Sequence, residues 1–390
     1  MDFKFSEEQN KFRQEVRDFL EEELRQGTFQ PSCDAWITGF SPEFTKKVAA
    51  KGWIGLTWPK EYGGQGRNYV DRLILTEEML RYGAPAACHW FADRQIGGAI
   101  LHYGTEEQKK ELLPKIMRGE AYVGLGMSEP EAGSDLASLQ TRAVEDGDDY
   151  VIDGQKVWTS GAHYMNYVYL VARTDPEAPK HRGISEFIVE TNLPGITIRP
   201  LTDITGGQHF NEVFFDGVRV PQKYLIGEKN KGFYQILNQL DYERSGMERL
   251  MANYPLFEAI IQFTKETKQN GKPLSQDPLI RSKLAQLKIE FEVGRLQIYR
   301  VAVVMDEGRA PNWESALSKV YCTAFEQHLA STAIAILGLY GQLSPESKWV
   351  PIRGLAHDSY LSSKGYSLQA GTSEILKNIL AMRKLELPSQ

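Results

Sequence analysis

Hydrophobic residues in the first part of the chain recur at the spacing of an amphipathic helix. The apolar positions of Glu7–Leu24 share one helical face, and Ser6, directly before them, is a typical N-cap. Thr105, followed by two glutamates, has the features of a second helix start. Trp58–Gly66 is turn chemistry between helices. We therefore expect helices from Ser6 to about residue 119.

The pattern changes near Ala121. From there to about Gly227, short β-branched and aromatic runs such as Tyr167–Val171 alternate with Gly, Asp and Pro. The pairs Asp153-Gly154 and Asp216-Gly217 are typical of hairpin turns. This region is predicted to form a compact antiparallel β domain.

Beyond Gly232 the helical periodicity returns, in segments long enough for a bundle of antiparallel helices. The predicted helices are 233–254, 256–270, 277–306, 313–337 and 373–384. The chain is thus expected to be an α+β multidomain protein with an N-terminal all-helical domain (1–120), a middle β domain (121–228) and a C-terminal helical bundle (229–390).

Size and composition fit this organisation. The 390 residues are 42% hydrophobic and 25% charged, which is ordinary for a globular protein with a large core. A net charge of −6 argues against a nucleic-acid or anionic-membrane surface protein. We find no apolar run of about 18 residues and no apolar signal core at the start. Three scattered cysteines fit a reducing compartment, so a cytoplasmic location is expected.

The first motif with candidate chemistry is Met127–Asp135. Ser128 and Ser134 offer hydroxyls, and Ala132-Gly133 allows the backbone to approach a ligand closely. A Gly-Ser loop beside a β domain is equally often a plain turn.

The second motif is Lys156–Gly161. Trp158 supplies a flat aromatic face, and Thr159 and Ser160 follow it with hydroxyl donors. A flavin ring needs such a wall on one face and polar groups at its edge. A core tryptophan beside surface hydroxyls is the alternative for this motif taken alone.

The third motif, Gln369–Lys377, reads as a loop that enters a helix. Gly371 permits a tight bend, and Thr372 or Ser373 can cap the helix, whose free N–H groups suit a phosphate or carbonyl oxygen. Ordinary capping is equally compatible. The chain lacks both a Gly-x-Gly-x-x-Gly dinucleotide fingerprint and a Gly-x-Ser-x-Gly elbow, and its seven histidines show no metal spacing, so no metal is expected.

Together, in this order and at these separations, the three motifs resemble the acyl-CoA dehydrogenase family of flavoenzymes, and the resemblance covers nearly the whole chain. It implies an N-terminal helical domain, a middle antiparallel β-barrel and a C-terminal four-helix bundle, with FAD as cofactor and usually a tetramer. The implied cofactor contacts are Leu125, Met127, Ser128, Trp158, Thr159, Ser160, Gly338, Thr372 and Glu374. Ser134, Asp241, Arg244 and Gly371 match positions that touch acyl-CoA.

The implied reaction is α,β-dehydrogenation of a fatty acyl thioester to the trans-2-enoyl-CoA. A carboxylate removes the α proton, a hydride leaves the β carbon for flavin N5, and electrons pass to an electron-transfer flavoprotein. Most members carry the catalytic Glu where this chain has Ala370. Alanine keeps the backbone N–H that hydrogen-bonds the thioester carbonyl, so the oxyanion site can survive without that carboxylate.

A subset of the family places its base on the first long helix of the bundle, just before an Arg. Glu243 and Arg244 match those positions, and a Glu in a water-poor pocket is expected to have a raised pKa suited to a base. The alternative is an ordinary Glu-Arg pair on a helix, and Glu248-Arg249, one turn later, is a second pair of this kind. We predict Glu243 as the base.

Two other departures from the family pattern concern the assembly of subunits. Thr267–Gly271 replaces an Arg-x-x-Phe-Gly string that holds the partner subunit's FAD in many members, and Ala335–Gly341 lacks a Gln and a second Gly. Members with this pattern include enzymes for branched, alicyclic or steroid side-chain thioesters, some built from two different chains. The chain is therefore expected to be a homotetramer or heterotetramer. A non-catalytic or half-site subunit is the main alternative, and a flavin monooxygenase relative is another.

Overall fold

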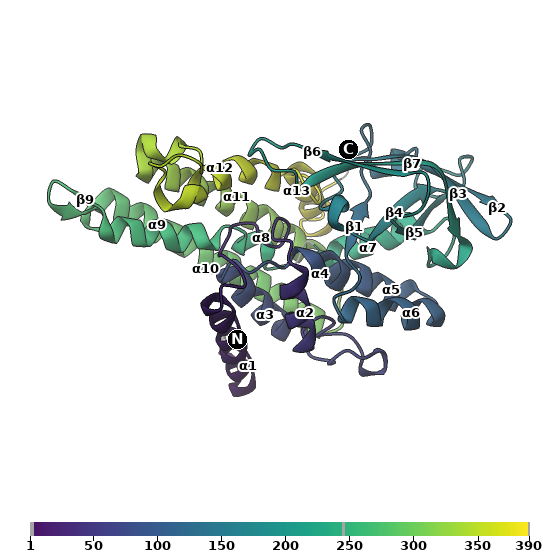
Figure 1. Cartoon of the computed structure of the whole chain (residues 1–390), viewed down its shortest axis with the longest axis horizontal. Coiled ribbons are helices and arrows are strands. Elements are labelled where there is room, and N and C mark those ends of the chain that lie inside the picture. The colour runs from purple at the N-terminus through teal and green to yellow at the C-terminus, as the bar shows by residue number, and fades with distance from the viewer. Residues whose placement is uncertain (1–3, 244–245, 389–390) are drawn as a thin grey trace. The chain divides into compact units, whose positions relative to one another are not determined.

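The computed structural model describes residues 4–243 and 246–388, with side chains omitted for residues 240–243. Its internal contacts divide the chain into two compact units (Figure 1). The first unit contains Met1–Trp36, Tyr69–Ala84 and Arg244–Gln390; the second contains Ile37–Asn68 and Pro85–Glu243. Each is described by itself. The boundaries predicted for three domains remain a prediction, whereas the order of helical, β and helical regions is confirmed.

The second unit is built on one sheet with the strand order β6-β7-β3-β2-β4-β5-β8, and β1 also pairs with β4. Most pairings are antiparallel, as predicted. β1 and β4 run parallel, as do β2 and β4 at Arg142 and Arg173, which the hydrophobic pattern could not distinguish. The strands are β1 (Val123–Gly126), β2 (Arg142–Asp146), β3 (Asp149–Lys156), β4 (Tyr167–Arg173), β5 (Ile184–Glu190), β6 (Ile196–Leu201), β7 (Phe210–Pro221) and β8 (Leu225–Ile226).

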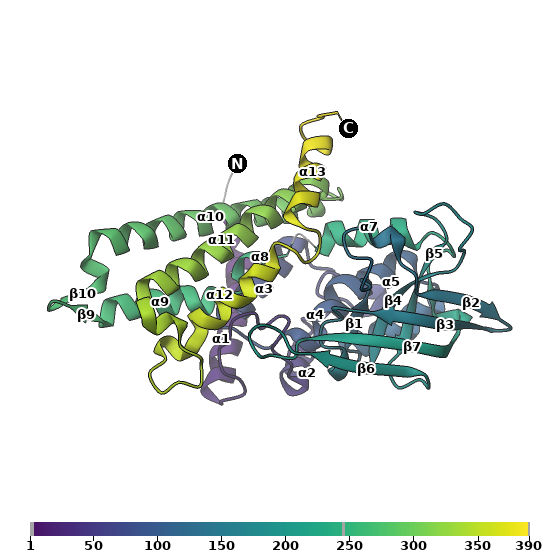
Figure 2. The ribbon, with the colours of Figure 1, turned by 90° about the horizontal axis from the view of Figure 1, so that it is seen from above.

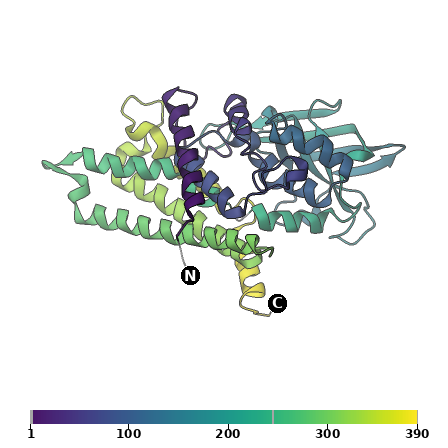
Figure 3. The ribbon, with the colours of Figure 1, turned by 90° about the horizontal axis from the view of Figure 1, so that it is seen from below.

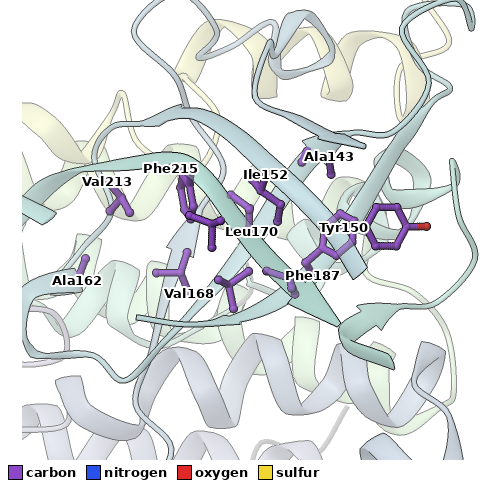
Figure 4. Packing of buried hydrophobic residues seen from close by; sticks show 13 residues of the cluster. Ala143, Tyr150, Ile152, Ala162, Val168, Leu170, Phe187, Val213 and Phe215 are labelled. Carbon is purple, nitrogen blue, oxygen red and sulfur yellow. The ribbon is translucent and has the colours of Figure 1, made fainter. Parts of the chain in front are cut away.

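Alternation decides which side chains form the core of this sheet. In β3 and β7 buried residues alternate with more exposed ones, except at Gly154 and at Asp216-Gly217, whereas β4 and β5 are buried along nearly their whole length because helices cover their other face. Figure 4 shows Tyr150, Ile152, Leu170, Phe187 and Phe215 from four of the strands in one apolar cluster.

Neither predicted hairpin turn is a turn. Asp153-Gly154 lies inside β3 and Asp216-Gly217 inside β7, where the register between the two strands shifts. Gly217 N–H donates to Asp153 Oδ1 at 2.9 Å across this irregularity. A β-bulge uses glycine at positive φ just as a tight turn does, so the dipeptides alone could not separate the two.

One helix of the second unit, α7, ends at the predicted base. α7 lies against β5 and against the π-helical segment η2 (Figure 2). The helices are α2 (Pro42–Ala50), α4 (Ala87–Phe91), η2 (Ala92–Ile96), α5 (Gly97–Tyr103), α6 (Glu106–Met117) and α7 (Gly232–Glu243), with 3-10 turns η1 (Lys60–Tyr62), η3 (Leu136–Ser138), η4 (Ala162–Tyr164) and η5 (Gln222–Tyr224). Thr105 caps α6 in a capping box with Gln108, as the sequence predicted.

The first unit is helical. The hairpin β9–β10 joins α9 to α10 at one end of both helices (Figures 2 and 3), and Phe257, Phe291 and Phe325 pack together between three helices. The elements are α1 (Glu7–Arg25), α3 (Tyr69–Arg81), α8 (Glu248–Met251), α9 (Tyr254–Glu266), β9 (Lys268–Gln269), β10 (Lys272–Pro273), α10 (Pro278–Asp306), α11 (Asn312–Leu337), 3-10 turns η6 (Leu274–Gln276), η7 (Gly338–Gln342) and η8 (Pro351–Gly354), α12 (Leu355–Tyr366) and α13 (Ser373–Arg383).

Several predicted helices agree closely with these bounds, and Ser6 caps α1 as predicted. The single helix predicted over 233–254 is wrong, since α7 ends at Glu243 and Gly246 and Met247 are not helical. Glycine costs about 1 kcal/mol in a helix relative to alanine, which favours a break there. α12 was not predicted. No helix within the described ranges is long and apolar enough to cross a bilayer.

A buried ion-pair network holds α1, α3 and α10 together in the first unit. Glu77 of α3 accepts hydrogen bonds from Arg13 at 2.9 Å, Arg295 at 2.5 Å and the Tyr299 hydroxyl at 2.6 Å. Burial opposes ionisation of Glu77, but the hydrogen bonds and charges of Arg295 and Arg13 outweigh it and lower its pKa to about 2.

Replacing Glu77 by Gln should therefore destabilise the protein by about 3–5 kcal/mol, because the half-buried Arg295 loses its carboxylate partner and Arg13 keeps only Glu78. The folded-state pKa is depressed, so this stabilisation is present above pH 4.5 and is lost as pH falls toward 2. Chemical denaturation at neutral and acidic pH measures it. The control Glu292→Gln removes only an exposed pair with Lys288 and should cost under about 1 kcal/mol. Equal losses at all pH values would contradict the linkage.

Candidate functional site

The loop of the first motif is fixed to the sheet by a buried ion pair. Lys156, at the end of β3, donates to Glu129 Oε1 at 2.7 Å and to the Met127 carbonyl at 3.0 Å. Glu129 also accepts the backbone N–H groups of Gln140 and Thr141. Burial lowers the pKa of Lys156 to about 8, although Glu129 opposes the shift. The pair thus joins residues 127–129 to the start of the second motif.

The second motif begins at the lysine of this ion pair. Val157 N–H donates to the Ser128 carbonyl at 2.9 Å, which brings the two motifs side by side. Trp158 then adopts a left-handed conformation with φ of 62°, rare for a bulky residue, and 60% of its surface is exposed. Asn211 of β7 holds the next residue: its carbonyl accepts from Thr159 N–H at 3.1 Å, and its side-chain amide donates to the Thr159 carbonyl at 2.9 Å. This strained turn holds the indole away from the core.

The hydroxyl group of Thr159 lies in the same turn. Its side chain is buried, and its hydroxyl oxygen has no hydrogen-bond partner among the residues that the structure describes. A buried hydroxyl without a partner costs free energy and calls for an explanation in a bound group. An exposed aromatic face beside an unsatisfied hydroxyl fits the edge and face of a flavin ring.

The other residues predicted beside the flavin lie in the same part of this unit. Leu125 is half-buried in β1, and an added Cβ at its neighbour Gly124 would lie 3.2 Å from Thr159 Cγ2. Met127 packs against a small apolar cluster that includes Ile184 and Ile236. Ser134, predicted to touch substrate, is exposed on the loop that follows the Glu129–Ala132 turn.

The third motif forms a strained loop in the first unit. Ala370 has a φ of 53° and Gly371 a φ of 93°, so two successive residues are left-handed. Lys319, buried in α11, donates to the Gly371 carbonyl at 2.8 Å. The Thr372 hydroxyl accepts from Ile375 N–H at 3.3 Å and caps α13, as predicted.

Two further predicted cofactor contacts lie in this unit. Gly338, directly after α11, has a φ of 61° that favours glycine. Glu374, in the first turn of α13, is exposed, and its own backbone N–H and the Thr372 hydroxyl lower its pKa.

The predicted base lies at the end of α7. Glu243 is the last residue of that helix and Asp241 precedes it by two positions, but neither side chain is described. Arg244 lies outside the described residues. The flavin-side residues and Glu243 belong to the second unit, whereas Ala370, Gly371, Thr372 and Glu374 belong to the first.

Sequence reasoning missed the two lysines that hold these loops. Lys156 could have been found, because it continues the inward alternation of Tyr150 and Ile152 along β3, and a charged residue at an inward position requires a partner. Lys319 lies in the long helix α11, and nothing in the sequence around it indicates its contact with a carbonyl more than fifty residues away.

Comparison with known proteins places the chain among flavoenzymes. Family models match residues 6–120 (acyl-CoA dehydrogenase, N-terminal domain), 124–218 (middle domain) and 230–385 (C-terminal domain). Acyl-CoA dehydrogenase FadE26 of Mycobacterium tuberculosis (strain ATCC 25618 / H37Rv) is 34% identical over 100% of this chain and 99% of its own length.

Two solved structures are similar over their whole length. The Tcur3481-Tcur3483 steroid ACAD is 32% identical with a TM-score of 0.90, covering 100% of both chains. The ChsE4-ChsE5 complex from Mycobacterium tuberculosis is 32% identical with a TM-score of 0.88, again covering 100% of both chains.

Replacing Lys156 by Met should destabilise the protein by about 3–5 kcal/mol, because Glu129 would remain as an uncompensated buried charge. The double variant Lys156→Met/Glu129→Gln should recover part of this loss, since the amide is neutral. Equilibrium denaturation of both variants measures the coupling. A double variant no more stable than the single one would show that the pair does not act as a charge pair.

Proposed function

Because the chain belongs to the acyl-CoA dehydrogenase family and is an oxidoreductase of that family, we propose that it converts an acyl-CoA thioester to the trans-2-enoyl-CoA with FAD as cofactor. The family is FAD-dependent. Electrons then pass to an electron-transfer flavoprotein. The observation that carries the proposal is the turn at Trp158 and Thr159, where an exposed aromatic face adjoins a buried hydroxyl without a partner among the described residues.

FAD binding is assigned to residues in and near the first two motifs and to residues in and near the third. Leu125, Met127, Ser128 and Ser160 would surround the ring together with the Trp158–Thr159 turn, and Gly338, Thr372 and Glu374 would lie along the rest of the cofactor. When bound, FAD supplies at N5 the acceptor for the hydride that leaves the β carbon. The hydrogen bond from Lys156 to the Met127 carbonyl, at 3.0 Å, supports this assignment because it holds the proposed ring-binding loops in place before FAD binds.

Glu243 is proposed as the base that takes the α proton. Its place as the last residue of α7, immediately before Arg244, supports this role, and the usual base position is occupied by Ala370, which has no carboxylate. The carboxylate would take the proton from C2 while the thioester carbonyl is polarised, since the α C–H is a poor acid without that polarisation. Asp241, Arg244, Ser134 and Gly371 are proposed to hold the acyl-CoA.

The backbone N–H of Ala370 is proposed to polarise the thioester carbonyl. The left-handed Ala370-Gly371 pair, held by Lys319 at the Gly371 carbonyl, supports this role because a strained loop persists only where its surroundings fix it. A preorganised donor stabilises developing enolate charge without reorganisation during the reaction.

An oligomer is also proposed. Ile289, Val293, Leu296 and Val303 are exposed along α10 at spacings of four, three and seven residues, the spacing of an apolar seam between helices. The partner is a second copy or a homologous chain, and the second arrangement would make this chain the half-site subunit of a heteromeric enzyme. The similar ChsE4-ChsE5 complex is a two-protein assembly and favours keeping this second candidate. A cytoplasmic location stays a prediction.

Glu243→Gln should lower turnover by about 10²–10⁴-fold, because the amide cannot accept the α proton. Bound FAD should remain at wild-type content. Anaerobic bleaching of the flavin over a panel of straight, branched and cyclic acyl-CoAs measures the loss of turnover.

The matched control is Glu248→Gln, the same change on α8, where a buried glutamate lies 3.8 Å from Arg249. It should retain bleaching. Activity in the Glu243 variant together with loss in the Glu248 variant would assign the base to α8. A purified wild-type chain that binds FAD but never bleaches alone, and does so only with a homologous partner, would favour the half-site subunit.

Thr159→Val keeps the shape of the side chain and removes the hydroxyl. We expect FAD affinity to fall about tenfold, the value of a hydrogen bond of about 1.5 kcal/mol, while the apoprotein becomes no less stable because its unsatisfied hydroxyl is gone. FAD titration and thermal unfolding of the apoprotein measure the two effects. Unchanged affinity would place the flavin elsewhere.

A further inference from the structure

A buried carboxyl group lies beneath the helix that ends at Glu243. Glu186, in the middle of β5, is fully buried, and it lies on the sheet face that α7 covers, since Ile184 two residues before it packs with Ile236 of α7. Gln235 of α7 donates to Glu186 Oε2 at 2.5 Å, and Gln239, one turn further, donates to Oε1 at 3.0 Å. Both oxygens of one sheet carboxyl are thus used by one helix.

The two glutamines are themselves tied to the sheet. Gln235 donates also to the Ile226 carbonyl at 3.2 Å and accepts from Glu228 N–H at 3.2 Å. Gln239 donates also to the Tyr169 hydroxyl of β4 at 3.2 Å. The cluster of Glu186, Tyr169, Gln235 and Gln239 therefore fixes α7 both along its axis and in rotation about it, which apolar packing alone does less sharply.

Helix geometry connects this cluster to the base. Positions 235, 239 and 243 are spaced by four residues and share one face of α7, and position 243 lies about 12 Å along the axis from position 235. A rotation of the helix would move position 243 with it. Resting on the proposed function of Glu243, we propose that Glu186 is a positioning residue, an uncharged carboxyl that sets the rotation of α7 and so the place at which the base is presented.

The chemistry of the cluster requires that carboxyl to be uncharged. The groups bonded to Glu186 are amides and a phenol, and Tyr169 and, beyond it, Tyr103 of α5 are the titratable groups facing it among the described residues. Burial without a cation raises the pKa of Glu186 to about 8, although its hydrogen bonds oppose the shift. A protonated Glu186 carboxyl has an O–H that needs an acceptor. Gln239 Oε1 has no partner within the described chain. Exchanging the positions of the oxygen and nitrogen of that amide would allow Oε1 to accept from the protonated carboxyl.

Ionisation then weakens the anchor. Because the folded-state pKa is raised from 4.5, the linked stabilisation is full below pH 4.5 and is lost as pH rises from there through 8, where the folded protein itself loses the proton. The wild-type enzyme should lose kcat across that range because a buried anion beneath α7 loosens the helix. Glu186→Gln, a neutral group of the same shape, should lack this alkaline loss and retain kcat within about twofold. Glu186→Leu should lower kcat about tenfold with KM little changed, since a small misplacement of a catalytic group costs up to ~10²-fold.

Hydrogen exchange of residues 232–243 provides a readout independent of turnover. After correction for the intrinsic exchange rate, protection of α7 should fall above pH 8 in the wild type, stay constant in Glu186→Gln and be low at every pH in Glu186→Leu. The matched control is Glu326→Gln, another buried glutamate with a raised pKa, bonded to Asn253 in the other unit. It should leave the α7 profile unchanged.

The outcomes separate the two proposals. If the exchange results are as expected but Glu243→Gln remains active, the anchor stands and the base assignment fails. If Glu243→Gln is inactive while α7 protection is the same in the wild type and both Glu186 variants, the positioning role is overturned. An alkaline loss of kcat that persists in Glu186→Gln also overturns it, and a lower unfolding temperature with unchanged kcat in Glu186→Leu would leave Glu186 a purely structural residue.

Discussion

The buried contact between Lys156 and Glu129 is the interaction on which the rest of the candidate site depends. A lysine ammonium taken out of water needs compensation, and here a carboxylate at 2.7 Å and the Met127 carbonyl at 3.0 Å supply it. These contacts bring the loop of the first motif to the end of β3. They fix the point from which the chain turns to present Trp158, so two segments separated in sequence become one surface.

The same device occurs a second time in the other unit. Lys319 is buried in α11 and donates to the carbonyl of Gly371, as Lys156 donates to the carbonyl of Met127. Each lysine is close to a non-glycine residue in the left-handed region, Trp158 in one case and Ala370 in the other. A backbone conformation that costs about 1–3 kcal/mol persists only where surrounding contacts enforce it. The loops assigned to cofactor and substrate are thus rigid because of lysines that themselves take no part in the chemistry.

The missing carboxylate changes which element must be placed accurately. When the base lies on a loop such as 369–372, that loop sets its position. With Ala370 in the loop, and on the proposal that Glu243 is the base, that position is set by the end of α7, which the polar cluster at Glu186 links to the middle of the sheet. Met127 packs against the same apolar cluster as Ile236 of α7. The loop proposed to bind the flavin ring and the helix proposed to carry the base therefore pack on the same apolar cluster within the second unit.

The sequence by itself determined the family and most of the elements. Periodicity located the helices near Ser6, Thr105 and Thr372 because caps and apolar faces are local features, and the motif residues carried the family resemblance. Tertiary structure decided the rest. Whether Asp153-Gly154 was a turn or a bulge depended on a partner strand, and the break after Glu243 and the parallel pairing of β1 with β4 depended on contacts outside any local window. The partners of Lys156, Lys319 and Glu186 lie 17 to 53 residues away, and the burial and pKa of each group depend on those partners rather than on its neighbours in sequence.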